Sequence, residues 1–486
     1  MKEQIKNIFK CVLFLLILLC SLTAINKVLV PKYILKNSTW PTTSSYRQFY
    51  KMEPNSIDVL FLGSSVCVNA FIPQEIYNDY GIRSYNLGSE QQSIFLSYYW
   101  LKEALRSQKP QVVVLDTKFM WDLHPENPIN TTEGLTRKCL DPMHYSDVKK
   151  EAVQNLCELD KTQSELSYYL TNIRFHSRWS ELAEYDIDSE MVDTSELKGF
   201  APITDNGPEA YTTYEQNDAE ITMEFPEVMQ EYLDKTVDLC KENGITLILV
   251  SLPGNEMNDA ANNTYTAYAH EKGIDYYNLC STSYYNQIGA VLPEESVIGH
   301  ENIWGAIKTS KFIGGLLSEK YAVNSATDDQ YEQTKSFYEE VITSSNLVRI
   351  TSPVDYLEAI NNPNYMVFMA GHGDFNLSDA IKSKMHERGI ATDSYEKISF
   401  YVALTDGGVI ENSSPDEVIN YTGSFRDKRS IFTLTSGCQN VVATSVINIE
   451  GIDYSKHMTG LNIAVYDMNM KYVIDQVCIN GEELTR

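Results

Sequence analysis

The chain is short of positive charge. Its 486 residues include 39 lysines and arginines against 66 aspartates and glutamates, which gives a formal net charge of −27. This balance argues against binding to nucleic acid or to an anionic membrane surface through overall charge. Hydrophobic residues make up 43% of the chain, the share of a folded protein, and the length is sufficient for two or three domains with full cores.

Metal-binding spacings of cysteine are also missing. The nine cysteines form no C-x-x-C pair and no cluster with histidine of the kind that holds structural zinc. Two of them, Cys11 and Cys20, lie in an apolar N-terminal run. The seven that remain are an odd number, so they cannot all pair with one another. The sequence therefore predicts mostly buried free thiols, with a Cys438–Cys478 disulfide as an open alternative, and no metal and no cofactor.

The N-terminus predicts where the protein resides. Three lysines within the first ten residues precede an apolar stretch at about 8–30, which is long enough to cross a bilayer. Lysines in this position favour an N-terminus inside the cell. A cleaved signal peptide is the alternative, but Leu22-Thr23-Ala24 is a poor cleavage site. We expect residues 1–36 to be a single-pass signal anchor in the cell membrane, with the residues after about 36 outside the cytoplasm.

Hydrophobic patterns divide the rest of the chain. Residues 37–56 read as a polar stem. Strand and helix patterns alternate over 57–325, which predicts a parallel sheet with helices on both faces. A helical, then acidic and loop-like stretch at about 119–225 interrupts the alternation and is expected to be an insertion over the site. Residues 326–340 read as a linker, and 341–486, with short helices and several strands, as an α+β domain.

A serine stands where an α/β enzyme would carry a nucleophile. Residues 57–65 read IDVLFLGSS, an apolar strand pattern that ends in a Gly-Ser-Ser turn, and a helical pattern follows from about Pro73. Such a turn exposes Ser65 at the carboxyl edge of the sheet, where open α/β sheets bind their ligands. Free backbone N–H groups there can stabilise an anionic intermediate. Gly-Ser-Ser is also an ordinary turn, so the serine needs a partner.

The candidate partner is a histidine far along the chain. Residues 300–306 read HENIWGA, and apolar residues at helical spacing follow. His300, directly before that helix, could accept the proton of the serine hydroxyl. The alternative is a surface or capping histidine.

These segments together resemble the SGNH/GDSL hydrolase superfamily over about residues 55–320. The first block of that family places the nucleophilic serine in a Gly-Asp-Ser-like turn after a strand, which Gly63-Ser64-Ser65 matches. The last block often reads His-x-Asn-x-x-Gly-Ala, which residues 300–306 match. The second block, whose glycine N–H helps to form the oxyanion hole, is similar to residues 85–89.

The resemblance implies a fold and a set of roles. The fold is α/β, with an SGNH-type parallel sheet flanked by helices, to which this chain adds an N-terminal transmembrane helix and a C-terminal α+β domain. Ser65 would be the nucleophile and His300 the general base, and the N–H groups of Ser65 and Gly88 would hold the oxyanion. The supporting residues implied are Ser64, Asn86 and Asn302.

Two positions depart from the family pattern. Val297 stands three residues before His300, where the family has the aspartate that orients the histidine. The candidates to replace this carboxylate are Glu294, Glu295 and Glu301, and a Ser-His dyad is the other possibility. Thr117-Lys118-Phe119 stands where the third block has an oxyanion-binding asparagine. Loss of a triad carboxylate can cost about 10⁴ in rate.

Two functions stay open. The resemblance looks closest to membrane-anchored members that act on envelope polymers, such as the D-alanyl transfer protein of teichoic-acid modification and alginate-type O-acetyltransferases. It implies an extracytoplasmic serine esterase or O-acyltransferase acting on an envelope polysaccharide or teichoic acid, with a membrane-bound O-acyltransferase as a partner. The alternative is a non-catalytic envelope protein that binds glycan and carries a degenerate SGNH site.

The C-terminal part resembles the interleukin-like EMT inducer domain. Gly460–Val465 and Val473–Asp475 match its Gly-x-Asn and Val-x-Asp strands. The usual order places the first of these segments at the start of the domain, whereas here it lies near the end, which suggests a circular permutation. The resemblance implies a non-catalytic domain that binds sugar. It also predicts that Leu461–Val465 lies near Tyr356–Ile360.

Overall fold

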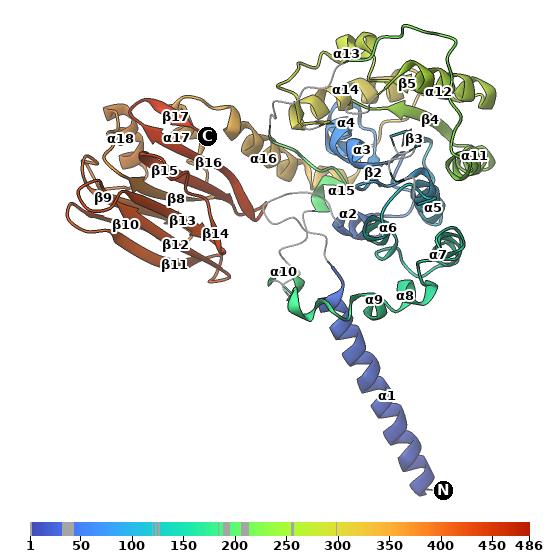
Figure 1. Cartoon of the computed structure of the whole chain (residues 1–486), viewed down its shortest axis with the longest axis horizontal. Coiled ribbons are helices and arrows are strands. Elements are labelled where there is room, and N and C mark those ends of the chain that lie inside the picture. Colours follow the sequence, from blue (N-terminus) through green and yellow to red (C-terminus); the bar gives the residue numbers. More distant parts are fainter. Residues whose placement is uncertain are drawn as a thin grey trace. The chain divides into compact units, whose positions relative to one another are not determined.

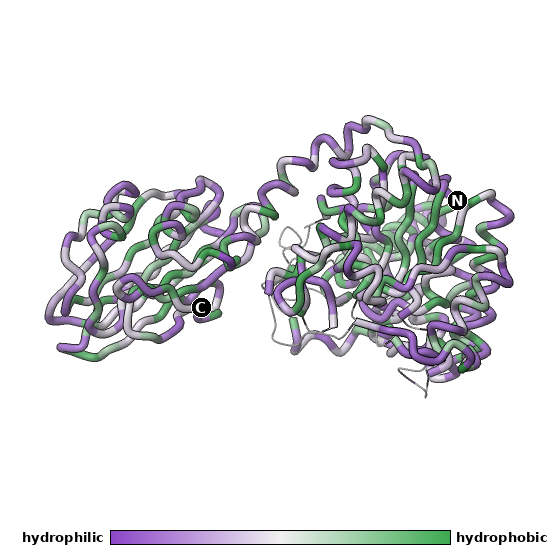
Figure 2. The backbone as a smooth tube through the Cα atoms, turned by 90° about the horizontal axis from the view of Figure 1, so that it is seen from above, coloured by the Kyte–Doolittle hydropathy of each residue, from purple (hydrophilic) through white to green (hydrophobic). Residues whose placement is uncertain are grey.

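The computed structural model divides the chain into two compact units (Figure 1). The first extends to Lys335 and the second begins at Ser336. Hydrophobic segments run through the interior of each unit (Figure 2). The structure describes residues 2–31, 43–118, 120–121, 124, 127–182, 184–187, 195–205, 213–253, 257–297 and 299–486.

A parallel sheet forms the centre of the first unit. Its five strands stand in the order β2-β1-β3-β4-β5, and each adjacent pair is parallel. The strands are short and mostly buried on both faces, which is typical of parallel sheets covered by helices. The predicted α/β architecture is therefore confirmed. The strands are β1 (Val59–Leu62), β2 (Ser84–Asn86), β3 (Val112–Asp116), β4 (Thr246–Ser251) and β5 (Asp275–Asn278).

Helices cover both faces of this sheet. Alternate strand residues such as Leu60 and Phe61 enter two different hydrophobic cores, because successive side chains point to opposite faces. The core on one face includes α5 (Ile94–Ala104), α11 (Glu227–Glu242) and α12 (Asp259–Lys272). The core on the other includes α3 (Ser65–Ala70), α4 (Pro73–Tyr80), α13 (Thr282–Ile288) and α14 (Ile303–Glu319). The short helix α3 was not predicted, because six residues are too few to show a period.

The insertion between β3 and α11 is partly integral to the core. Its helices α6 and α7 share the hydrophobic core of α5, and the indole of Trp100 donates to the carbonyl of Cys139 at 3.1 Å. Residues 171–178 of the insertion lie beside the end of the N-terminal helix (Figure 1). The elements are α6 (Glu133–Leu140), α7 (Asp147–Leu159), α8 (Glu165–Tyr169), α9 (Asn172–Phe175), η1 (Arg178–Ser180), α10 (Glu184–Ile187) and η3 (Ser195–Leu197).

The N-terminal helix α1 (Lys2–Leu29) projects from the first unit (Figure 1). Its 28 residues make it about 42 Å long. The stretch Glu3–Leu29 is long and apolar enough to cross a membrane: its most apolar 18 residues have a mean hydropathy of 2.6, and none of them is buried against protein. A signal sequence would have the same length and composition. Only its end packs on the first unit, where Leu29 is buried.

The predicted polar stem differs from the structure in its second half. Residues 37–42 lie outside the described residues, but α2 (Thr43–Phe49) belongs to the main core. Tyr46 is fully buried and stacks on Trp100, with ring centroids 4.2 Å apart. The aromatic residues of this stretch, rather than its overall polarity, decide its position.

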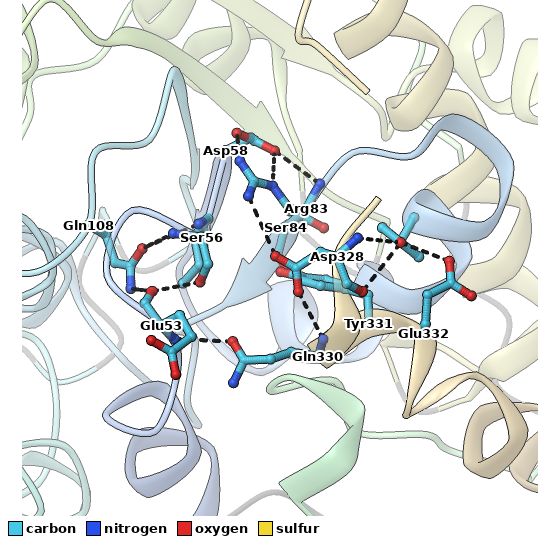
Figure 3. A network of polar contacts seen from close by, with 12 residues as sticks. Glu53, Ser56, Asp58, Arg83, Ser84, Gln108, Asp328, Gln330, Tyr331 and Glu332 are labelled. Atoms are coloured by element: carbon cyan, nitrogen blue, oxygen red, sulfur yellow. Dashed lines mark hydrogen bonds and ion pairs between the residues drawn. The ribbon is translucent and has the colours of Figure 1, made fainter. Parts of the chain in front are cut away.

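The amino-terminal edge of the sheet is closed by a polar network (Figure 3). Asp58 precedes β1 and accepts two hydrogen bonds of 2.8 Å from the guanidinium of Arg83, which precedes β2. Arg83 also pairs with Asp328 at 3.5 Å, beside α15 (Asp329–Glu332), and Asp58 raises the pKa of the guanidinium. The end of the first unit is thus fastened to the sheet edge that lies opposite the carboxyl ends of the strands.

The second unit is built around strand β8 (Tyr365–His372). It pairs antiparallel with β15 and β9 and meets β12 at one parallel position. Its alternate residues enter two cores, one shared with α17 and α18 and one shared with β11–β14. The other strands are β9 (Ser399–Thr405), β10 (Gly408–Ser414), β11 (Ile419–Phe425), β12 (Ser430–Gly437), β13 (Thr444–Ile449), β14 (Ile452–Asp453), β15 (Gly460–Asp467), β16 (Tyr472–Asn480) and β17 (Glu483–Thr485). The helices are α16 (Lys335–Asn346), η4 (Leu347–Arg349), α17 (Pro353–Ala359) and α18 (Asp379–Glu387).

The sequence did not predict the long strands β10 and β11 or the short strands β14 and β17. β10 and β11 expose much of their surface, so they lack the apolar alternation of a half-buried strand. Tyr356 and Leu357 of α17 share one core with Leu461 and Val465 of β15. The segments expected to be neighbours therefore lie in one unit, and the assignment to a permuted family stays a prediction.

We predict that a fragment of residues 336–486 folds cooperatively by itself, since the unit has its own cores. The measurement is thermal and urea unfolding of the isolated fragment. Ile463→Ala, which truncates a fully buried side chain of β15, should lower its free energy of unfolding by about 2–4 kcal/mol. A fragment without a cooperative transition would contradict the prediction.

Candidate functional site

The first strand of the sheet delivers Ser65 to its carboxyl edge. β1 ends at Leu62, Gly63 and Ser64 form the turn, and Ser65 is the first residue of α3. Gly63 adopts φ +150°, and a Cβ there would lie 2.4 Å from the Cβ of Asp116. The turn therefore needs a glycine, because the neighbouring strand β3 occupies the space of any side chain.

Ser65 and His300 meet although they are 235 positions apart. The Oγ of Ser65 lies 2.8 Å from the Nε2 of His300, within hydrogen-bond distance. His300 belongs to the two-residue strand β7 (His300–Glu301), which pairs with β6 (Ser296–Val297) directly before α14. Both side chains are partly exposed, so the pair is open to a substrate. The predicted proximity is confirmed.

Hydrogen bonds at both ends hold the histidine segment in place. Asn302 caps α14 by accepting from the Gly305 N–H, and its Nδ2 donates to the carbonyl of Glu294 at 2.8 Å. One turn after Ala306, the buried Ser310 hydroxyl accepts from the Ile72 N–H at 2.8 Å and donates to the Ala70 carbonyl at 3.1 Å. The helix that follows His300 is thereby tied to the end of the helix that carries Ser65.

A segment of the insertion joins the two halves of the site. Residues 197–205, here called the strap, run from the end of β2 past α3 to the start of α14. The Ala201 N–H donates to the Val68 carbonyl at 3.0 Å, and the Ile203 carbonyl accepts from the Ile303 N–H at 2.8 Å. A Cβ at Gly199 would lie 1.8 Å from the backbone oxygen of Asn86, so this approach requires glycine.

Asp116 is a site residue that was not predicted. It ends β3, is buried, and its Oδ2 accepts from both the N–H and the hydroxyl of Ser64, at 3.1 and 2.6 Å. Its Oδ1 accepts from the Lys118 N–H at 3.0 Å. Burial raises the pKa of Asp116, and the hydrogen bonds from Ser64 oppose that rise. Asp116 thus positions Ser64, the residue next to Ser65. The one feature of the sequence that could have indicated this role is that a single acidic residue ends the apolar strand β3.

The expected oxyanion donors differ from each other. The Ser65 N–H has no hydrogen-bond acceptor among the described residues, and is free to donate. The Gly88 N–H instead donates to the Oδ1 of Asn86 at 3.1 Å, so the prediction that it faces an oxyanion does not fit this arrangement. Asn86 also donates to the carbonyls of Cys67 and Phe71, which fastens the β2 loop to α3.

The glutamates proposed to orient His300 are engaged elsewhere. Glu295 pairs with Lys308 at 2.8 Å and accepts from the Val291 N–H. Glu301 accepts from the Thr309 hydroxyl at 2.7 Å, because adjacent residues of β7 point to opposite faces. Glu294 is exposed, and its carboxylate makes no hydrogen bond to His300. These contacts join none of the three carboxylates to His300, and a triad that includes one of them stays a prediction.

No group of three or more histidines, cysteines or acids within the described ranges could hold a metal ion. All nine cysteines are free thiols, and six of the seven outside α1 are buried, the exception being Cys157. None of these thiols takes part in the contact between Ser65 and His300.

Comparison with known proteins gives only distant likenesses to solved structures. No family model matches the chain, and no curated protein matches it. Five chains of solved structures are similar, among them a protein of Bacteroides fragilis NCTC 9343 to which an acylhydrolase activity is ascribed. It is 13% identical, the match covers 56% of this chain and 94% of that one, and the TM-score is 0.26. A score of this size does not establish a shared fold.

We predict that Asp116→Asn lowers the free energy of unfolding by about 1–3 kcal/mol, since one amide oxygen cannot replace both carboxylate oxygens and a buried donor loses its acceptor. Urea unfolding of the full chain measures this. The matched control is Asp275→Asn, which breaks an exposed pair with Lys320 and should cost below about 1 kcal/mol. Equal effects of the two substitutions would contradict the role of Asp116.

The pH dependence of stability should reveal Glu301. Burial raises its pKa from 4.5 to about 8, so the stability that goes with its protonated form is complete below about pH 4.5 and is lost as the pH rises through 8. Glu301→Gln cannot ionise and should flatten this part of the profile, each pKa unit being worth about 1.4 kcal/mol. Unfolding between pH 5 and 9 measures the slope, with the exposed Glu294→Gln as control. Parallel profiles for Glu301→Gln and the unsubstituted chain would refute the argument.

Proposed function

We propose that the first unit is a serine esterase or O-acyltransferase of the SGNH/GDSL type. The observation that carries the proposal is the 2.8 Å contact between Ser65 Oγ and His300 Nε2. It lies at the carboxyl edge of a parallel sheet, where enzymes of this architecture place their sites. A hydroxyl held against an imidazole in a partly exposed position is the arrangement of an activated serine nucleophile.

The geometry supports a two-step acyl transfer. His300 takes the hydroxyl proton of Ser65 through Nε2 while Oγ bonds to the acyl carbon of an ester, and the carbonyl oxygen becomes an oxyanion that the Ser65 N–H can hold. The tetrahedral intermediate then breaks its bond to the leaving oxygen, which receives the proton from His300. Water, or a sugar or polyol hydroxyl, next attacks the acyl-serine while His300 takes its proton, and Ser65 is regenerated.

The rate should be modest. None of the three glutamates near His300 in sequence hydrogen-bonds to it, and Gly88 does not offer its N–H. Removing one oxyanion donor costs about 10²–10³ in rate. These features favour, as a second candidate, a non-catalytic glycan-binding protein with a degenerate site.

The substrate class follows from the resemblance. Membrane-anchored relatives of this type act on envelope polysaccharides or teichoic acids outside the cytoplasm, and some receive acyl groups through a membrane-bound O-acyltransferase. The apolar helix α1 with lysines at its start supports the same location for this chain. The second unit, by its resemblance to the interleukin-like EMT inducer domain, would bind the glycan.

We expect Ser65→Ala to abolish hydrolysis of p-nitrophenyl acetate by the full chain, because the acyl-serine can no longer form. The measurements are release of p-nitrophenol and a search by mass spectrometry for an acetyl group on Ser65. His300→Gln should reduce the rate by at least about 10²-fold.

The matched control is Ser283→Ala, which removes an exposed hydroxyl at the start of α13 and should leave the rate unchanged. Hydrolysis that persists in Ser65→Ala would exclude Ser65 as the nucleophile. No hydrolysis and no acetylation by the unsubstituted chain would favour the glycan-binding candidate.

A further inference from the structure

Apolar side chains gather on the surface of the insertion around the end of α1. Here α9, η1 and α10 lie beside the last turns of that helix, and α8 precedes α9 (Figure 1); together they cover residues 165–182 and 184–187. This stretch, called below the juxtamembrane surface, leaves five large apolar side chains between 45% and 73% exposed. They are Leu166, Leu170, Ile173, Trp179 and Ile187. Single exposed apolar residues are ordinary, but five on one short stretch mark an interaction site.

Hydrogen bonds set the depth of this surface along α1. The hydroxyl of Thr171 donates to Asn26, the side chain of Asn172 donates to the carbonyl of Leu22 at 3.4 Å, and Arg178 donates to the carbonyl of Leu29 at 2.6 Å. Asn26-Lys27 is where polar residues first interrupt the apolar run of α1. If α1 spans a bilayer, that interruption marks its outer boundary, and α9 lies at the same level.

The two arginines of the surface are neutralised within the protein, whereas Glu165 and Glu181 are exposed. Arg178 pairs with the buried Asp186 at 3.0 Å, and Arg174 pairs with Glu133 at 2.8 Å. We therefore expect this surface to enter the headgroup region through its apolar side chains, since its arginines are already paired and do not attract anionic lipid. Tryptophan, present here as Trp179, is the residue that favours the membrane interface.

We propose that the juxtamembrane surface lies in the headgroup interface of the bilayer that α1 spans. The occupant of this surface is lipid, and together with α1 it fixes the tilt and height of the first unit over the membrane. The proposal depends on α1 spanning a bilayer and is independent of the esterase proposal, so either one can fail without the other.

Quenching of tryptophan emission by brominated lipid tests this. The full chain is reconstituted into vesicles of phosphatidylethanolamine and phosphatidylglycerol whose acyl chains carry bromine near the headgroup. Of the five tryptophans, Trp100 and Trp304 are buried and Trp179 is 61% exposed. Trp179→Phe should lower the share of emission that bromine quenches, whereas Trp304→Phe should raise it. An unchanged share in Trp179→Phe would overturn the proposal.

A second experiment tests whether a tryptophan added to the juxtamembrane surface is quenched by brominated lipid. In the Trp179→Phe background, Leu170→Trp adds an indole at a position that is 56% exposed on the juxtamembrane surface and should restore quenching. Ile221→Trp is the matched control. Ile221 is 49% exposed in the same unit but lies against α12, where its carbonyl accepts from Asn263. If bromine quenches both new indoles equally, or neither, the proposal is wrong.

Discussion

The site depends on the packing of α14 against the junction of α3 and α4. The buried Ser310 hydroxyl satisfies one backbone N–H and one backbone carbonyl at that junction, so a shift of α14 would leave buried polar groups without partners. His300 directly precedes α14 and Ser65 begins α3, so this one contact controls the distance between their side chains. The strap adds hydrogen bonds to the same two helices, which makes part of the insertion a component of the site.

At the carboxyl edge of the sheet, the turn before Ser65 is held by Asp116, a residue that the sequence pattern did not indicate. Asp116 reaches across from β3 to Ser64, and the space it fills is available only because residue 63 is glycine. Burying a carboxylate is costly, and the three hydrogen bonds that it accepts offset that cost. These hydrogen bonds hold the turn before Ser65 in place, and none of them involves His300. The residues that position the nucleophile are therefore different from those that orient the histidine.

The two ends of the first unit have different surroundings. At the amino-terminal edge of the sheet, Asp58, Arg83 and Asp328 form a closed polar network that fastens the segment leading to the second unit. Beside α1, the insertion exposes apolar side chains instead. If α1 spans a bilayer, an apolar surface beside it would limit how far the first unit can tilt.

Local sequence determined the parallel sheet, the apolar N-terminal helix, the turn that carries Ser65 and the position of His300 before a helix. Each of these features depends on the spacing of apolar residues, or on turn-forming residues, within a short segment of the chain. The sequence missed β10 and β11, because their exposed polar residues give no alternation. Tertiary structure alone decided the partners: strand alternation in β7 turns Glu301 away from His300, and the β2 loop gives the Gly88 N–H to Asn86. Asp116 and the strap belong to the site because distant segments pack there, and no local pattern records such packing.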